Sequence, residues 1–415
     1  PEIQKIAEES FQKKELFSAN YDALPDSPQI PQAGITIVSN QEDSMGQIVA
    51  MVGGFGEKTS NMIFNRATQA YRQPGSSIKP ILVYAPAMDT GFITAASVLI
   101  DEEKHLDPRN PDRAWPQNSD RRYEGPVTIR HALRHSLNTT AVEVYTELLS
   151  PSIGLSYLKR MGVDRTTETQ PAGALGAFGK GMTTVEMVGA YTALANRGIY
   201  TEPYLFTRVI DAEGRVLLEH KPKFEQVFST ETADIMTNLL VDTIRNAPWI
   251  GPYSSIGQQP VAGKTGTSDE RIDRWFCGYS PYYTAAVWYG FDNANGRRTE
   301  INRADTPSPI KIWRDIFAQI HEDLEIRSFP MSDKVVSRKV CAESGMLPTE
   351  FCPKTITEYF DSSKSHSYPQ LPCSIHAEEP EPDPDDTVDP VPDPDDPDES
   401  EPVIIVPDET EPEEP

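Results

Sequence analysis

The feature that most constrains this chain is the position of its β-rich runs, which lie on both sides of a helical middle. Residues 34–38 and 47–52 are rich in β-formers and are separated by a polar turn with glycine, so they predict a hairpin. Residues 274–278 and 284–290 flank a Ser-Pro turn and predict another. A sheet built from these strands joins distant parts of the chain, which predicts an α+β fold.

The segments between and around these hairpins follow helical and strand periodicities. We expect an amphipathic helix near the N-terminus that ends before Pro25, and we expect the middle helices to cover one face of the sheet. A third hairpin is expected from residues 205–210 and 216–220. The other predicted helices are 127–136, 139–149, 153–161, 184–196 and 310–324.

Charge is distributed very unevenly along the 415 residues. The net charge is −25, but residues 377–415 hold 18 acidic side chains and no Lys or Arg, so residues 1–376 carry only −7. The 11 prolines and like charges of that tail predict disorder. The acidic excess argues against nucleic acid as a main partner. No run of 18 apolar residues occurs, and the start at Pro1 suggests a piece of a longer protein.

Three short motifs carry the candidate chemistry. They are Ser76-Ser77-Ile78-Lys79, Ser136-Leu137-Asn138 and Lys264-Thr265-Gly266-Thr267, where the last is expected to open a strand. Each motif alone has a simple structural explanation, such as a helix-capping serine or a solvated lysine. In combination they predict a single catalytic site in which a serine is the nucleophile and a lysine is its base.

Ser76 and Lys79 are three residues apart at an expected helix start, so they lie on one face of it. A serine hydroxyl needs a base beside it to act as a nucleophile at neutral pH. Lys79 can be that base only when it is unprotonated, and a second cation nearby would lower its pKa. Lys264 is the candidate for this cation.

The remaining motif residues are expected to complete the site. Ser136 would relay the proton to a leaving amine, while the Asn138 amide would hold Lys79 and a substrate carbonyl. Gly266 would keep a strand edge bare, so that a peptide-like substrate can pair with it. The backbone N–H groups of Ser76 and Thr267 would form an oxyanion hole.

The motif order and its surroundings resemble the transpeptidase domain of bifunctional, class A penicillin-binding proteins. This resemblance implies a penicillin-binding/serine β-lactamase-like fold, with a mostly antiparallel sheet and a helical subdomain. It also implies that a membrane anchor and a glycosyltransferase domain belong upstream and are missing from this chain. The matching segments are Phe64–Pro80, Tyr123–Asn138, Gly189–Tyr191, Ala195–Gly198 and Val261–Thr267.

The resemblance further implies a D,D-transpeptidase without cofactor or catalytic metal. Ser76 would attack the carbonyl between the two terminal D-alanines of a peptidoglycan stem peptide, and an amine of a neighbouring stem peptide would resolve the acyl-enzyme. Thr265 and Thr267 would bind the terminal carboxylate of the donor, and β-lactams would acylate Ser76. The location would be the outer face of the bacterial cytoplasmic membrane, with cell-division or elongation proteins as further partners.

Other members of the same broad class share these motifs. A β-lactamase would need a general-base glutamate after Asn138, and Glu143 and Glu147 lie in a predicted helix without the expected surroundings. A monofunctional carboxypeptidase and a class B transpeptidase are further alternatives. A different kind of alternative is a serine/threonine-kinase-linked sensor or a catalytically silent binding module with the same fold. Asn118 is expected to be a loop residue that binds its own backbone.

The sequence predicts a transpeptidase domain over 1–325, a small Cys/His-containing appendix over 326–376 and the acidic tail. Cys277 is expected to be a buried apolar residue. Cys341, Cys352, Cys373 and His376 lie in the appendix, which has few apolar residues with which to form a core. A disulfide that leaves one cysteine over, a zinc site of three thiolates and one imidazole, and free thiols all remain open.

Overall fold

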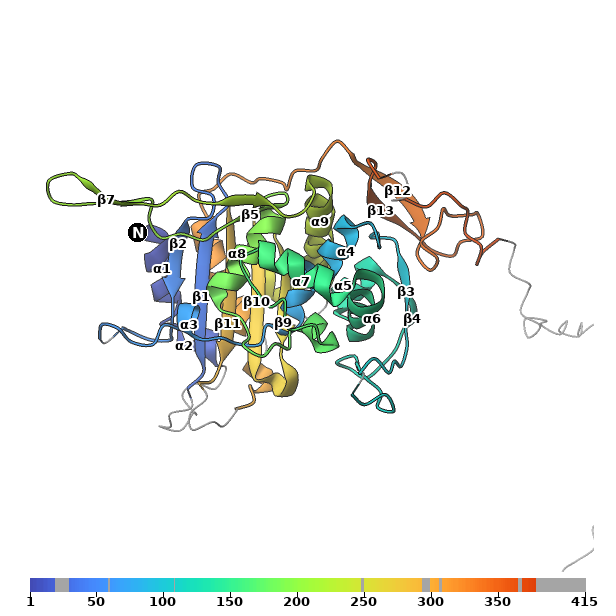
Figure 1. The fold of residues 1–415 in the computed structure, drawn as a ribbon, viewed down its shortest axis with the longest axis horizontal. Coiled ribbons are helices and arrows are strands. Elements are labelled where there is room, and N and C mark those ends of the chain that lie inside the picture. Colours follow the sequence, from blue (N-terminus) through green and yellow to red (C-terminus); the bar gives the residue numbers. More distant parts are fainter. Residues whose placement is uncertain are drawn as a thin grey trace, which may run out of the picture. The chain divides into compact units, whose positions relative to one another are not determined.

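The fold is centred on one antiparallel sheet with the strand order β2-β1-β11-β10-β9 (Figure 1). The computed structural model describes residues 1–18, 30–58, 60–107, 109–247, 250–292, 299–305, 308–364 and 368–377. Residues 1–377 form one compact unit. The strands are β1 (Gln32–Ser39), β2 (Ile48–Val52), β9 (Ala262–Thr267), β10 (Asp273–Tyr279) and β11 (Tyr283–Gly290). The expected pairing of distant hairpins is confirmed, because β1 pairs with β11.

Successive side chains of these strands enter two different cores. In β10, Trp275 and Cys277 pack into one core, while Phe276 between them packs into the other. The helices α8 (Thr184–Ala195) and α9 (Thr230–Asn246) contribute to the first core, and α1 (Glu2–Ser10) and α11 (Ser308–Ile320) to the second. The expectation that the middle helices cover one face agrees with this arrangement, and the first and last helices of this domain cover the other face.

Most predicted elements are present with small changes of bounds. Helix α5 (Ile129–His135) starts later than predicted because residues 125–128 form β4 (Gly125–Thr128), which pairs with β3 (Val98–Asp101). The third hairpin is β6 (Arg208–Ile210) with β7 (Val216–Glu219). The other elements of the middle region are α6 (Asn138–Glu143), which continues into η4 (Val144–Leu149), α7 (Pro151–Arg160), β5 (Ile199–Thr201) and β8 (Phe224–Gln226).

The predictions for the two ends of the chain can be compared with the structure only in part. The N-terminal helix is interrupted after Ser10 and resumes as α2 (Lys14–Phe17), and its predicted continuation toward Pro25 lies outside the described residues. The acidic tail from residue 378 onward also lies outside them. Among the helices that are described, none combines the length and apolar composition that crossing a bilayer requires.

Two prominent elements were not predicted at all. Helix α9 is a helix of 17 residues that begins after Ser229, whose hydroxyl accepts a hydrogen bond from Thr232 N at 3.2 Å. The hairpin of β12 (Val335–Cys341) and β13 (Thr355–Asp361) forms the C-terminal part of the unit.

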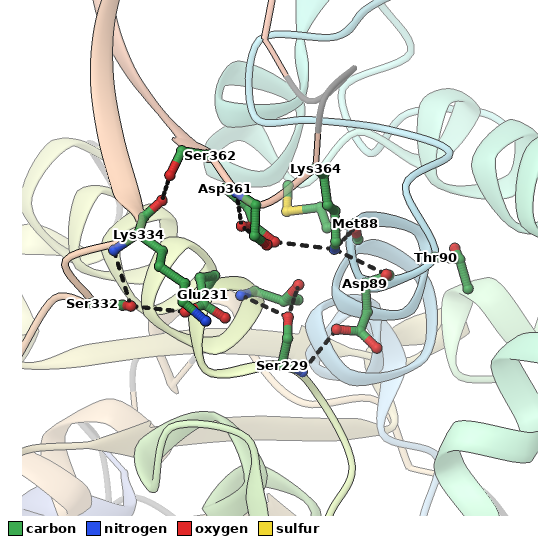
Figure 2. Close-up of polar contacts among 12 residues, drawn as sticks. Met88, Asp89, Thr90, Ser229, Glu231, Ser332, Lys334, Asp361, Ser362 and Lys364 are labelled. Carbon is green, nitrogen blue, oxygen red and sulfur yellow. Dashed lines mark hydrogen bonds and ion pairs between the residues drawn. The ribbon is translucent and has the colours of Figure 1, made fainter.

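The β12–β13 hairpin is fastened to the helical region by polar contacts (Figure 2). Lys364 Nζ donates to the carbonyl oxygens of Met88 at 3.3 Å and Asp89 at 3.0 Å, and Ser332 Oγ donates to Glu231 at 2.8 Å. These contacts join the residues on either side of the hairpin to the end of α4 (Ala85–Asp89) and to the start of α9.

A buried ion pair adds to this attachment. Glu358 of β13 is completely buried, and both of its carboxylate oxygens accept hydrogen bonds at 2.6 Å from Arg130 of α5. A paired arrangement of this kind offsets the desolvation of both charges, whereas removal of one partner leaves the other charge buried and unpaired.

We therefore expect Glu358→Ala to lower the free energy of unfolding by about 3–5 kcal/mol. Urea denaturation compares this variant with Glu350→Ala, which alters an exposed glutamate of the same region. A loss no greater than that of the Glu350 variant would show that the pair contributes little.

Candidate active site

The turn before Ser76 is held in place by hydrogen bonds to two other segments of the chain. Gln73 clamps the backbone of Phe178, since its Nε2 donates to the carbonyl at 2.7 Å and its Oε1 accepts from the amide at 2.8 Å. Trp275 Nε1 donates to the carbonyl of Gln73 at 2.9 Å. Ser76, the expected nucleophile, follows within the 3-10 helix η2 (Gly75–Ile78) and is partly exposed.

Two glycines allow this turn to lie directly against β9. Gly75 has φ of +57°, and a Cβ there would stand 2.3 Å from the carbonyl oxygen of Thr267. A Cβ on Gly266 would stand 2.1 Å from the carbonyl oxygen of Pro74. A glycine is therefore needed at position 266 because β9 packs closely on the turn that precedes Ser76. We expected only that it would keep the strand edge bare. The Lys-Thr-Gly-Thr motif also ends β9, whereas the sequence predicted that it opens a strand.

Lys79 is completely buried and is surrounded by acceptors from the second motif. Its Nζ donates to the carbonyl oxygens of Ser136 at 2.8 Å and Leu137 at 2.9 Å, and to Asn138 Oδ1 at 2.7 Å. The contact between Asn138 and Lys79 agrees with the expected geometry. Within the described part of the chain, Lys79 Nζ has no hydrogen bond to Ser76 Oγ in this state.

Ser136 contacts both lysines through different atoms. Its carbonyl faces Lys79, and its hydroxyl accepts a hydrogen bond at 2.9 Å from the equally buried Lys264 Nζ. Ser136 contacts the two lysines from an uncommon backbone conformation, since it ends α5 in the left-handed region with φ of +57°. Thr265 follows Lys264 in β9 and accepts from its Nζ through the backbone carbonyl at 3.3 Å.

Burial dominates the electrostatics of this lysine pair. Burial, and then the nearby charge of Lys264, lower the pKa of Lys79 well below its ordinary value. Burial also lowers the pKa of Lys264 to about 7. The three acceptors around Lys79 act in the opposite direction, because they favour the ammonium form. The expected effect of Lys264 is therefore present but second to burial.

Asn118 does more than bind its own loop. Its Nδ2 donates to Arg122 O at 2.9 Å, as expected, but also to both oxygens of Asp101 at 2.8 and 3.0 Å. Its Oδ1 accepts from Asn138 N at 2.8 Å, at the first turn of α6. Asp101 in turn accepts from Thr139 Oγ1. This buried network fixes the backbone that presents Asn138 to Lys79, and no motif in the sequence pointed to it.

Arg274 is a second residue that the sequence reasoning missed. It lies opposite Thr267 in the β9–β10 register, and its Nη1 donates to Thr267 Oγ1 at 2.6 Å. Burial, and then the nearby Arg271, lower the pKa of this guanidinium to about 10. An arginine within a strand that is otherwise apolar is the one signal that could have drawn attention to it.

The glutamates considered as a hydrolytic base have other surroundings. Glu143 forms an ion pair with Lys104 at 3.0 Å, and Glu147 is exposed. Within the described residues, two groups have the composition and proximity to hold a metal ion, and neither includes a residue of the three motifs. One is Glu124 with His131 and His135, and the other comprises Cys341, Cys352, Cys373 and His376.

Comparison with known proteins identifies the family. Residues 35–318 match the family described as penicillin binding protein transpeptidase domain, and residues 331–376 match penicillin-binding protein 1A, C-terminal domain. Because the first match covers more than half of the chain, this chain belongs to the penicillin-binding protein transpeptidase family. The predicted family and its α+β fold are confirmed.

Individual relatives agree with this assignment. The chain is 36% identical to penicillin-binding protein 1A of Clostridium tetani over 80% of this chain and 43% of that protein. It is 33% identical to penicillin-binding protein 1F of Bacillus subtilis, with coverages of 75% and 42%. The crystal structure of penicillin-binding protein 1A from Haemophilus influenzae superposes with a TM-score of 0.70 at 26% identity, over 82% of this chain and 54% of that one. The chain thus spans less than half the length of these two curated relatives.

The buried charge of Lys264 leads to a prediction about stability. Below about pH 7 the folded protein contains a charged Lys264 that is shielded from water, which lowers the free energy of unfolding. Between pH 7 and 10.5 the Lys264 side chain is neutral in the folded protein and protonated in the unfolded chain, so the free energy of unfolding rises with pH across that range. We expect Lys264→Met to raise Tm by about 2 °C or more below pH 7, with a gain that shrinks as the pH rises.

Differential scanning fluorimetry across this pH range measures the effect, and Lys339→Met, at an exposed position of β12, is the matched control. A difference in Tm between Lys264→Met and wild type that does not change with pH would contradict the lowered pKa.

Proposed function

We propose that this chain is a serine D,D-transpeptidase that cross-links peptidoglycan stem peptides through an acyl-enzyme on Ser76. The observation that carries the proposal is the burial of Lys79 and Lys264 on either side of Ser136. This arrangement lowers the pKa of a lysine three residues after a partly exposed serine, which is what nucleophilic catalysis by serine requires.

Acylation begins when neutral Lys79 accepts the proton of the Ser76 hydroxyl. A neutral amine has two hydrogens, so one of the three acceptors of Lys79 loses its donor, and the nitrogen lone pair becomes available. The Ser76 oxygen forms a bond to the carbonyl carbon of the penultimate D-alanine, and the carbonyl electron pair moves to oxygen. The backbone N–H groups of Ser76 and Thr267 stabilise this oxyanion, consistent with the contact of Gly75 and Thr267.

Collapse of the intermediate breaks the amide bond. The leaving nitrogen takes the hydroxyl proton of Ser136, which is replaced from Lys264 Nζ at 2.9 Å. D-Alanine departs, and the ester on Ser76 remains. An amine of a second stem peptide then attacks this ester and loses a proton to Ser136, which passes one back to Lys264. The ester bond breaks as Lys79 returns its proton to the Ser76 oxygen, while attack by water in place of the amine would give a D,D-carboxypeptidase side reaction.

The donor carboxylate is assigned to the end of β9. Thr265 and Thr267 supply hydroxyl groups there, and Arg274 adds a cation that already contacts Thr267. β9 is an edge strand of the described sheet, so a peptide can pair with it as a further strand. A β-lactam combines a reactive carbonyl with a carboxylate and is expected to acylate Ser76 in the same pose.

We extend the proposal to the organisation of the protein. The transpeptidase domain is assigned to 1–325 and the appendix to 326–376, which the family matches over 35–318 and 331–376 support. The activity is assigned to the outer face of the cytoplasmic membrane, because the substrate is peptidoglycan. Proteins of the division or elongation machinery are proposed as partners of the full-length protein.

Labelling by a fluorescent penicillin tests the nucleophile and its base. Wild-type protein is expected to be labelled covalently, and Ser76→Ala is expected to remain unlabelled. Lys79→Ala is expected to acylate about 10² to 10⁴ times more slowly because the general base is lost. Lys159→Ala, which removes an exposed lysine, should retain the wild-type rate. An unlabelled wild type would favour a silent binding module, and labelling of Ser76→Ala as strong as that of wild type would exclude Ser76 as the nucleophile.

Arg274 is tested by changing the ligand and the residue together. Arg274→Gln is expected to lower the second-order rate of acylation by penicillin about tenfold to a hundredfold, the worth of a hydrogen bond to a charged group. The methyl ester of the same penicillin lacks the carboxylate charge, so wild type and variant should react with it at similar rates. An equal loss with acid and ester would assign Arg274 to the structure of the sheet instead.

A further inference from the structure

Three cysteines and one histidine converge at the loop end of the β12–β13 hairpin, and none of them belongs to the three catalytic motifs. Cys341 is the last residue of β12, Cys352 lies in the loop between the strands, and Cys373 and His376 follow β13. Their candidate ligand atoms all lie within 4.8 Å of one another. Residues from three separate segments thus direct their sulfur and nitrogen atoms at a single point.

The spacing of these atoms fits a tetrahedral metal ion. A zinc ion with ordinary bond lengths to sulfur and imidazole nitrogen sets its S and N ligands about 3.6 Å apart. His376 Nδ1 lies 3.5 Å from Cys341 Sγ and 3.4 Å from Cys373 Sγ. The three cysteines are free thiols in the structure. A disulfide between two of them would not explain why the third thiol and the imidazole lie at the same place.

The surroundings of His376 are those of a metal ligand. Its Nδ1 faces the sulfurs, and its Nε2 lies 3.2 Å from a carboxylate oxygen of Glu343. Histidines that bind a metal commonly donate their other ring N–H to a carboxylate, which fixes the tautomer and the ring orientation. Glu343 follows Cys341 by two residues, so the same turn supplies a thiol and this carboxylate.

Each sulfur also receives hydrogen bonds that favour a thiolate. The backbone N–H groups of Glu343 and Ser344 donate to Cys341, and Ser344 Oγ donates to Cys373 at 3.1 Å. Thr349 N donates to Cys352 Sγ at 3.3 Å. Three negative sulfurs this close repel one another, and a divalent cation between them removes that repulsion.

We propose that Cys341, Cys352, Cys373 and His376 bind one Zn²⁺ ion as a closed structural site. Three thiolates with one imidazole favour zinc over hard cations such as Mg²⁺ or Ca²⁺, and four protein ligands leave no open position for chemistry. The inference goes beyond the proposed transpeptidase activity, to which the site contributes no reacting group.

The structure also shows why such a site is useful here. Among the described residues, the apolar cluster at the hairpin has three buried members, with Val336, Ile356 and Tyr368 partly buried against them, and one of the three, Ala96, belongs to the transpeptidase region. A core of this size contributes little stability, so small domains of this kind depend on a covalent or metal staple. The ion would tie the loop after β12 and the segment after β13 to the end of β12.

Metal analysis of the full chain, purified without chelators, tests the proposal. We expect about one zinc per chain by mass spectrometry of the metal content, and a loss of most of it in Cys352→Ser. Cys277→Ala changes a buried cysteine of β10 outside the cluster and should retain the zinc. A wild-type protein without bound metal, even after Zn²⁺ is supplied and excess removed, would overturn the assignment.

A second measurement uses the wild-type chain alone, so it does not depend on a variant that folds. Thiol alkylation followed by peptide mapping should show Cys341, Cys352 and Cys373 protected until a chelator removes the zinc. Fluorescent penicillin labelling of Ser76 in the same samples reports the transpeptidase site separately. Cysteines that are protected with or without chelator, and that become reactive only after reduction, would establish a disulfide and refute the zinc site.

Discussion

The burial of two lysine side chains around one serine is the constraint on which the rest of this site depends. Lys79 and Lys264 have no solvent access, and removing an ammonium group from water costs several kcal/mol unless acceptors replace the water. Ser136 supplies one acceptor to each lysine, and this requires its left-handed backbone at the end of α5. The end of α5, the start of α6 and strand β9 must therefore meet at one point.

Much of this arrangement was accessible from the sequence, because it rests on local patterns. The strands β1, β10 and β11 follow runs of β-formers with turn residues between them, and α8 follows a capped apolar segment; the predicted bounds of these elements lie within two residues of the observed ones. The motif residues could be expected to lie together because a serine nucleophile needs a lysine of lowered pKa beside it, and the structure does bring Lys79, Ser136 and Lys264 into contact.

The missing parts depend on contacts between residues that are distant in sequence. Helix α9 escaped prediction because part of its buried face is polar: Thr232, Asp234, Thr237 and Thr243 are buried, which weakens the apolar period. Asn118 looks like any loop asparagine until the backbone of Asn138 lies beside it. The middle of β12, Ser337–Lys339, is a run of three exposed polar residues, so no apolar alternation marks β12 as a strand.

The helix that presents Ser136 is fixed from outside the catalytic motifs. Arg134 of α5 pairs with Asp242 of α9 at 2.7 Å, and Arg130 pairs with Glu358 of β13. Both partners belong to elements that no local pattern predicted. A site that depends on the placement of one serine between two lysines thus takes part of its precision from an appended hairpin. A metal ion at the Cys/His cluster would therefore act on the proposed catalysis only through packing, because it would join the loops next to β12, and β12 pairs with β13, whose Glu358 binds Arg130 of α5.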